Sequence, residues 1–145
     1  MRSESENLDA RFHAYELPGG WNVFAGRTDD DNDLLSTTLA NPDDWWFHAA
    51  SGVPGSHVIL RARTDAEPPR EILKQAAAIA AYHSKARAAS NVAVSCTRAR
   101  YVTKPRRAKP GLVQIEHETT YKVRPAIPHP SRTARASEVR GDAAS

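Results

Sequence analysis

This chain of 145 residues has little of several features that would define its class. It holds one cysteine, and no apolar run approaches the roughly 20 residues needed to cross a bilayer. The single thiol, Cys96, excludes an internal disulfide. Residues 1–10 carry charges with no apolar stretch behind them, so we expect no secretory signal. We therefore expect a soluble, cytoplasmic protein with no membrane partner, and a length of this size predicts one domain.

Motifs of catalysis and of phosphate binding are also absent from the sequence. No glycine-rich phosphate loop occurs, and Ser56 lies in Pro-Gly-Ser-His rather than in the Gly-x-Ser-x-Gly elbow of hydrolases. The acidic run 29–33 begins like a calcium loop, but Leu34 and Ala40 stand where glycine and glutamate are needed. We therefore expect no catalytic residue, no metal site and no cofactor, and we expect that the protein is not an enzyme.

Charge is distributed unevenly along the chain. Residues 1–71 contain 13 acidic and 6 basic side chains, whereas residues 72–145 contain 4 acidic and 14 basic ones. The densest basic stretch, residues 98–109, includes no acidic side chain. Because a lysine or arginine beside a phosphate displaces a condensed counterion, this pattern favours a polyanionic partner such as nucleic acid. The alternative is a solvated, flexible loop.

Alternating apolar and polar residues, bounded by turn residues, predict seven strands. The expected strands span residues 21–26, 45–50, 57–63, 92–97, 101–103, 112–116 and 119–123. The second and third are joined by a Pro-Gly turn and should form a hairpin or nearly one. Cys96 falls in such a segment, which indicates a buried, reduced thiol.

One long helix should open at Pro68-Pro69 and carry Lys85 and Arg87 in its last turn. Its single apolar stripe comprises Ile72, Ala76, Ile79, Ala80 and His83. A turn at 29–33 and a short helix at 34–40 are also expected. These elements predict an α+β fold, a single domain with a largely antiparallel sheet and one long helix packed across it.

The ends of the chain are poor in apolar side chains. We expect residues 1–15 to form a polar N-terminal segment, residues 16–125 to form the domain, and residues 126–145 to form a disordered C-terminal tail.

Aromatic residues gather at Trp45-Trp46-Phe47, between Asp44 and His48. Such a cluster suits either a small core or a stacking platform for a base or sugar. We place Trp46 in the core, and since side chains alternate along a strand, Trp45 or Phe47 lies on the opposite face, where an exposed ring could stack on an unpaired base. Two alternatives stay open: a protein-interaction adaptor that uses this cluster, and a metal-dependent enzyme at Asp44, His48 and His57.

Five motifs follow one another along the body of the chain. They are Gly26-Arg27 with Asn32-Asp33, Asp44-Trp45-Trp46-Phe47-His48-Ala49, Pro54-Gly55-Ser56-His57-Val58, Ala81-Tyr82-His83-Ser84-Lys85-Ala86-Arg87, and Lys109-Pro110-Gly111-Leu112-Val113. In this order they resemble the NFACT-R domain, from about Trp21 to Pro125. Residues 28–31 depart from that family, because they are acidic where Asn and Lys are more usual.

The resemblance implies an RNA-binding module of ribosome quality-control factors, which engage tRNA and stalled 50S or 60S subunits. In those factors the module accompanies an N-terminal NFACT domain, helix-hairpin-helix segments and a coiled coil, and the other domains support tailing of the stalled peptide. We therefore expect a role in stalled-ribosome rescue with tRNA or the large ribosomal subunit as partner, and no tailing by this chain. A protein that supplies the missing NFACT domains is left open as a further partner.

The resemblance and the charge pattern together predict the residues that contact RNA. Phosphate contacts are expected from Arg27, Lys85, Arg87, Lys104, Arg106, Arg107 and Lys109. Asn32 and His57 are expected to donate hydrogen bonds to a sugar or base. Asp33, Trp45 and His48 complete the predicted RNA-binding set.

Overall fold

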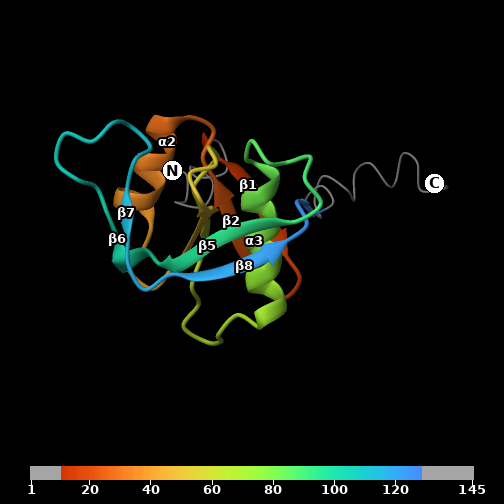
Figure 1. Cartoon of the computed structure of the whole chain (residues 1–145). Helices are drawn as coiled ribbons and strands as arrows, with labels where there is room; N and C mark the ends of the chain where they lie inside the picture. The colour runs from red at the N-terminus through yellow and green to blue at the C-terminus, as the bar shows by residue number, and fades with distance from the viewer. Residues whose placement is uncertain (1–10, 129–145) are drawn as a thin grey trace.

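The computed structural model describes residues 11–128 and confirms the α+β fold with a largely antiparallel sheet (Figure 1). Six strands form the main sheet in the order β1-β2-β4-β3-β5-β8, with every neighbouring pair antiparallel. They are β1 (His13–Leu17), β2 (Trp21–Ala25), β3 (Trp45–Ala49), β4 (Val58–Leu60), β5 (Val92–Arg98) and β8 (Thr119–Val123). The pairing of β3 with β4 confirms the expected hairpin.

Two of the predicted strands are short and leave the main sheet. β6 (Val102–Thr103) pairs only with β7 (Gln114–Ile115), and a 3₁₀ turn, η2 (Ala99–Tyr101), separates β6 from β5. The chain between β6 and β7 projects as a loop beside α2 (Asp29–Leu34), in cyan at the left of Figure 1. The basic stretch of the sequence therefore lies at one end of the sheet.

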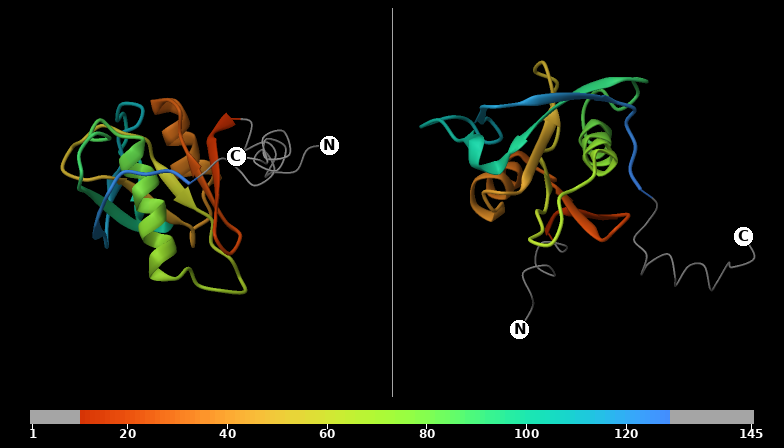
Figure 2. Two further views of the ribbon diagram at one scale, coloured as in Figure 1. Left: turned by 90° about the vertical axis from the view of Figure 1, so that its right-hand side faces the viewer. Right: turned by 90° about the horizontal axis from the view of Figure 1, so that it is seen from below.

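The long helix is α3 (Arg70–Tyr82), and the Pro-Pro pair directly precedes it as predicted. Ile72, Ala76, Ile79 and Ala80 of the predicted apolar stripe are buried, whereas His83, its fifth member, lies just beyond the helix and is only half-buried. Small alanine side chains let the helix axis approach the sheet closely, and Figure 2 shows the helix lying across it. None of the helices in the described part of the chain has the length and apolarity needed to cross a membrane.

The C-terminal end of α3 differs from the prediction. The helix ends at Tyr82, so Lys85 and Arg87 follow it and do not lie in its last turn. The cause is tertiary: the backbone N–H of Ser56 donates to the His83 carbonyl at 2.9 Å, and that of Lys85 donates to the Pro54 carbonyl at 2.9 Å. Hydrogen bonds to another loop replace the next helical turn.

The segment expected to turn at 29–33 is also different, because it forms the helix α2. Thr28 caps it, with its hydroxyl accepting a hydrogen bond from the Asp31 N–H at 3.0 Å. Carboxylates in a first helical turn interact favourably with the helix dipole, so the same aspartates that suggested a turn support a helix start. A π-helical turn, η1 (Leu35–Leu39), continues α2 within the region predicted as a short helix.

The sheet buries a different apolar cluster on each face. α3 covers the face that carries Val23, Phe47 and Leu60, whereas Phe24 and Trp46 point to the other face, toward η1 and β6. Trp46 is 3% exposed, which confirms its place in the core. Cys96 is also buried, and burial raises the pKa of its thiol to about 12.

The expected three-part division of the chain stays a prediction. Residues 1–10 and 129–145 lie outside the described residues, and these include most of the N-terminal segment and of the C-terminal tail. The sheet already begins at His13, and Phe12 is buried against Trp46, so ordered structure starts a few residues before residue 16.

Candidate nucleic-acid interface

Three motif loops meet where α3 ends. Gly55 and Ser84 form an isolated β-bridge, and a Cβ on Gly55 would lie 2.9 Å from the Ser84 Cβ and 3.0 Å from the His83 carbonyl oxygen. Only glycine permits this approach of the two backbones. The Pro-Gly loop thereby fixes the segment that carries Lys85 and Arg87.

The third loop is attached in a similar way. The Ser56 hydroxyl donates to the Gly26 carbonyl at 2.6 Å, and the Gly26 N–H donates to the His57 carbonyl at 3.1 Å. A Cβ on Gly26 would overlap the side-chain oxygen of Asn32. These contacts fix the backbone next to Arg27, so motifs 30 to 60 residues apart in the sequence become neighbours.

Together the loops line an open cleft of about 360 Å³. Its lining includes Arg27, Lys85 and Arg87, and we call it the cationic cleft. Arg27 donates to the carbonyls of Arg11 at 3.1 Å and Phe12 at 3.4 Å. Arg87 donates to the Tyr82 carbonyl at 2.8 Å and stacks on the Tyr82 ring with its guanidinium carbon 4.4 Å from the ring centroid.

Ion pairing separates these cations from most other arginines. Arg11, Arg61, Arg63, Arg98, Arg100 and Lys104 each pair with a carboxylate. Within residues 11–128, no carboxylate forms an ion pair with Arg27, Lys85 or Arg87. Their charges are therefore held by backbone carbonyls or left in solvent, and they are available to an anionic ligand.

The remaining predicted phosphate contacts lie in the loop between β6 and β7, which we call the basic loop (residues 104–109). Asp33 anchors it, pairing with the Lys104 ammonium at 3.1 Å and accepting a hydrogen bond from the Gly111 N–H at 3.0 Å. Arg106 and Arg107 are exposed, and Arg107 has a φ of 63°. Asp29, at the start of α2, lies beside Gly111, where a Cβ would come within 3.0 Å of its carboxylate oxygen, and it also lines the cationic cleft. The acidic first turn of α2 thus lies between the cleft and the end of the segment that carries the basic loop.

His57 lies behind this surface in a buried chain of hydrogen bonds. It is 2% exposed, and its Nε2 donates to the Gly111 carbonyl at 3.0 Å. Its Nδ1 therefore accepts from the Ser36 hydroxyl at 2.7 Å, and that hydroxyl in turn accepts from the Trp46 indole N–H at 2.9 Å. Burial, with a smaller effect from the charge of His48, lowers the pKa of His57 to about 4. The neutral ring joins the core to the base of the basic loop.

Asn32 belongs to the same buried network. Its side-chain oxygen accepts a hydrogen bond from the His57 backbone N–H at 3.0 Å, and the residue is buried. His48 is half-buried, with its ring centroid 5.4 Å from that of His57, and burial lowers its pKa. His57, expected to donate a hydrogen bond to RNA, instead uses both ring nitrogens inside the protein. Asn32 uses its side-chain oxygen in this network and also lines the cationic cleft, so donation from its amide NH2 group to RNA stays a prediction.

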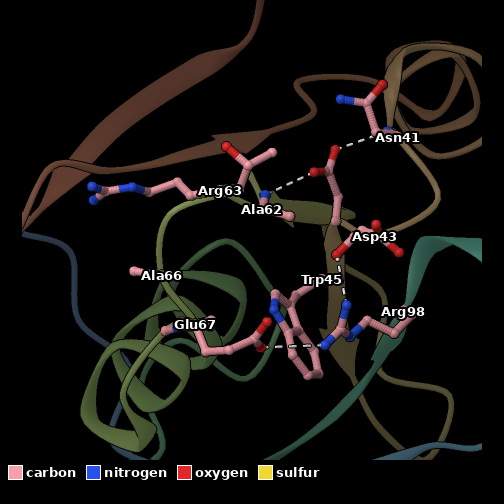
Figure 3. Close-up of a pocket in the computed structure, with 11 residues that line it drawn as sticks. Asn41, Asp43, Trp45, Ala62, Arg63, Ala66, Glu67 and Arg98 are labelled. Atoms are coloured by element: carbon pink, nitrogen blue, oxygen red, sulfur yellow. Dashed lines mark hydrogen bonds and ion pairs between the residues drawn. The ribbon is translucent and has the colours of Figure 1, made fainter.

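Trp45 lies away from the cationic cleft. Its half-buried ring is covered by the Arg98 guanidinium, whose central carbon is 3.7 Å from the ring centroid (Figure 3). Arg98 also donates to the Asp43 carbonyl at 3.1 Å and pairs with Glu67 at 3.6 Å. Because Trp46 and Phe47 are buried, the aromatic cluster offers one partly exposed ring to a partner.

Asp44, His48 and His57, considered as metal ligands, do not form a metal site among the described residues. The Asp44 carboxylate is fully buried, pairing with Arg61 at 2.6 Å and accepting hydrogen bonds from the N–H groups of Asn41 and Ala62, each at 2.8 Å. Its oxygens thereby join the segment before β3 to the segment that follows β4. Between residues 11 and 128, no three His, Cys, Asp or Glu side chains are grouped as a metal ion requires.

Residues that the sequence analysis missed also line the cationic cleft. His13 comes from β1, which was not predicted, and its ring stacks on that of His83, with centroids 4.5 Å apart and an interplanar angle of 19°. The Tyr15 hydroxyl forms a hydrogen bond of 2.6 Å with His83 Nε2. The sequence holds no local signal for this contact, since 68 residues separate Tyr15 from His83.

Comparison with known proteins agrees with the motif resemblance. Residues 11–117 match the family described as NFACT protein RNA binding domain. The protein named Rqc2 homolog RqcH is 40% identical over 111 residues in Bacillus subtilis (strain 168), and 37% identical over 103 residues in Streptococcus suis (strain 05ZYH33). These matches cover 77% and 71% of this chain but only 19% and 18% of the relatives.

A solved structure has the same fold. It is the C-terminal part of the fibronectin/fibrinogen-binding protein from Streptococcus suis, which is 35% identical and superposes with a TM-score of 0.72. The match covers 79% of this chain and 46% of that one. The buried motif network and the cations around it therefore lie in a recognised module, and the chain belongs to the NFACT protein RNA binding domain family.

Proposed function

We propose that this domain binds tRNA or the RNA of the large ribosomal subunit, through the cationic cleft and the basic loop acting together. The observation that carries the proposal is the convergence of Arg27, Lys85 and Arg87 on one cleft, while six other described cations are neutralised by carboxylates. A concentration of unpaired cations around a hollow focuses the electrostatic potential and attracts a polyanion. Membership of the NFACT protein RNA binding domain family supports RNA as that polyanion.

The two surfaces contribute differently to binding. Arg27 and Arg87 are oriented by hydrogen bonds to backbone carbonyls, so little side-chain entropy is lost when they contact a phosphate. Arg106 and Arg107 extend from the basic loop without such support among the described residues and add general attraction to the backbone. The cleft sets the position of the RNA, and the loop strengthens binding to any RNA nearby.

We further infer a role in ribosome quality control. The similarity to Rqc2 homolog RqcH supports this, although the chain spans about a fifth of the length of those relatives. The domain contributes RNA contact and no chemistry of its own, and peptide tailing belongs to other parts of such factors. Those parts come from a protein partner if they are not joined to this chain.

Binding to three RNAs across a salt series tests the proposal. The protein is titrated with tRNA, with 50S subunits and with a random RNA of matched length. We expect tight binding to tRNA or 50S that survives moderate salt, and weaker, more salt-sensitive binding to the random RNA. Equal, weak binding to all three that is lost at modest salt contradicts the proposal.

A double variant tests the basic loop within the same assay. Arg106→Ala with Arg107→Ala should weaken binding to all three RNAs alike and reduce the salt dependence, by a slope of about 0.7 to 0.9 for each phosphate that is no longer neutralised. Lys74→Ala, on the exposed side of α3, is a matched control that should bind as the wild type does. Unchanged affinity in the double variant removes the loop from the binding surface.

A further inference from the structure

The cationic cleft contains flat rings as well as charges. His13 and His83 both line it and stack on each other, 4.5 Å apart. The Tyr15 hydroxyl fixes the His83 ring through Nε2 at 2.6 Å, and the Tyr82 ring packs edge-on against His83 with centroids 5.2 Å apart. These contacts therefore fix the ring pair in position beside Arg27, Lys85 and Arg87. An isolated histidine on the surface would lack such contacts and could rotate freely.

The charge state of the two rings separates them from the cations. Burial, followed by the charges of His13, Arg87 and Arg27, lowers the pKa of His83 to about 4. Burial and Arg27 also lower the pKa of His13. At neutral pH both imidazoles are uncharged, so they add no positive charge for phosphate. They can instead offer a ligand the flat face of a ring for stacking, and the His13 ring is partly exposed.

A cleft with these two chemistries matches the two parts of a nucleotide. Arginine and lysine bind phosphate, and a flat ring such as histidine stacks on an unpaired base. Its volume of about 360 Å³ lies within the roughly 300–1,000 Å³ typical of small-molecule sites. In a duplex the bases are stacked on one another and paired, so they cannot reach such a ring.

We propose that the cleft holds one unpaired nucleotide of single-stranded RNA, with its phosphate between Arg27, Lys85 and Arg87 and its base stacked on His13. The inference rests on the proposed RNA-binding function and narrows it to RNA with a loop, bulge or free end. It assigns His13, which no sequence motif marks, as the residue that distinguishes unpaired from paired RNA.

Three short RNAs test this with the full chain. They are an unstructured eight-nucleotide RNA, an abasic oligomer of the same length and charge, and an eight-base-pair duplex. We expect the wild type to bind the first roughly fivefold to tenfold more tightly than the abasic oligomer, as loss of one stacked base predicts. Equal affinity for these two oligomers overturns the inference without any variant.

Variants of His13 identify the ring responsible. His13→Ala should abolish the preference for the oligomer with bases and leave duplex binding unchanged, whereas His13→Phe, which keeps a flat ring, should retain the preference. Urea unfolding confirms that each variant is folded. A preference that persists in His13→Ala overturns the assignment.

Lys85→Ala separates this inference from the function on which it rests. It should weaken binding to all three RNAs, because it removes a phosphate contact. If no RNA binds the wild type, the proposed function fails, and the nucleotide site fails with it. If RNA binds and Lys85→Ala weakens it, but bases make no difference, only the nucleotide site fails.

Discussion

The buried network around His57 and the cationic cleft adjoin each other, with Asn32 belonging to both, yet they differ in burial, charge and bonding. In the network, the Asn32 side-chain oxygen and both ring nitrogens of His57 are hydrogen-bonded to protein groups, and both residues are buried. In the cleft, Arg27 and Lys85 are exposed and carry charges that no described carboxylate pairs with. Arg27 and Asn32 belong to one motif, yet Arg27 is exposed and Asn32 is buried.

The difference shows that one motif can contain both residues that stabilise the fold and residues that are available to contact a ligand. Buried polar groups must be hydrogen-bonded, so the network specifies one arrangement of the loops. That arrangement places the exposed cations, which contribute little to folding, where a ligand can reach them. Substitutions in the network should therefore change stability, and substitutions in the cleft should change RNA affinity.

The largest expected effect is on the network side of this comparison. Trp46→Ala removes a buried ring and the donor to Ser36, so the free energy of unfolding should fall by about 3–5 kcal/mol. Urea denaturation measures it. Trp45→Ala is the matched control, because its ring is only half-buried, and it should cost clearly less. Equal losses in the two variants would break the assignment of Trp46 to the core.

Acid should also act on the network. The pKa of His57 is about 4 in the folded protein, compared with the ordinary value of 6.5 expected in the unfolded chain. Between pH 4 and pH 6.5 the unfolded chain therefore binds more protons than the folded protein. The contribution of neutral His57 to stability is complete above pH 6.5 and is lost as the pH falls toward 4. The free energy of unfolding should fall by at most about 1.4 kcal/mol per pH unit from this residue.

Urea midpoints measured from pH 7.5 to pH 4.5 test this slope. His57→Gln lowers stability at neutral pH but removes the titrating group, so its slope should be shallower than that of the wild type. A wild-type slope that His57→Gln leaves unchanged would assign the acid sensitivity to other groups.

Removal of charge from the cleft should lower RNA affinity and leave stability nearly unchanged, in contrast to substitutions in the network. Arg27→Ala with Arg87→Ala should weaken RNA binding by roughly tenfold, since each arginine is expected to hold a phosphate, while the free energy of unfolding changes by less than about 1 kcal/mol. Arg100→Ala removes an arginine that is already paired with Asp43, and its RNA affinity should stay within about twofold of wild type. Fluorescence anisotropy with tRNA compares the three proteins.

The smallest expected effect concerns the carboxylate that lines the cleft. Asp29→Asn removes a negative charge beside Arg27 and should tighten RNA binding by roughly twofold to threefold at low salt, with the gain vanishing at high salt. Asp30→Asn, in the same helical turn but absent from the cleft lining, is the control and should gain less. Weaker binding by Asp29→Asn would mean that this carboxylate supports the loop through Gly111 rather than opposing RNA.

Much of the fold could be predicted from local pattern. The period of four and three residues in Ile72, Ala76 and Ile79 predicted α3, and alternation in 21–26 predicted β2. α2 was missed because consecutive aspartates favour turns, and the Thr28 cap that starts the helix was not recognised. β1 was missed because its short, mixed-polarity sequence is supported mainly by its partner strand β2.

The candidate site was predicted in part. The charge pattern and the motifs identified Arg27, Lys85 and Arg87, which do line one cleft. They could not show that His57 points inward or that the Asn32 side-chain oxygen is bound within the protein, because motif membership carries no information about burial. The stacking of His13 on His83 also could not be predicted, since it joins an edge strand to the end of a helix 70 residues later.

The sequence by itself determined the class of this protein: an α+β domain with a cationic second half and the ordered motifs of an RNA-binding family. These properties follow from composition and short-range periodicity, which act within a few residues. Only the tertiary structure decided which motif residues support the fold and which face a ligand. That division depends on hydrogen bonds between loops distant in sequence, such as Ser56 to Gly26 and Lys85 to Pro54, and these form only when the sheet and α3 are assembled.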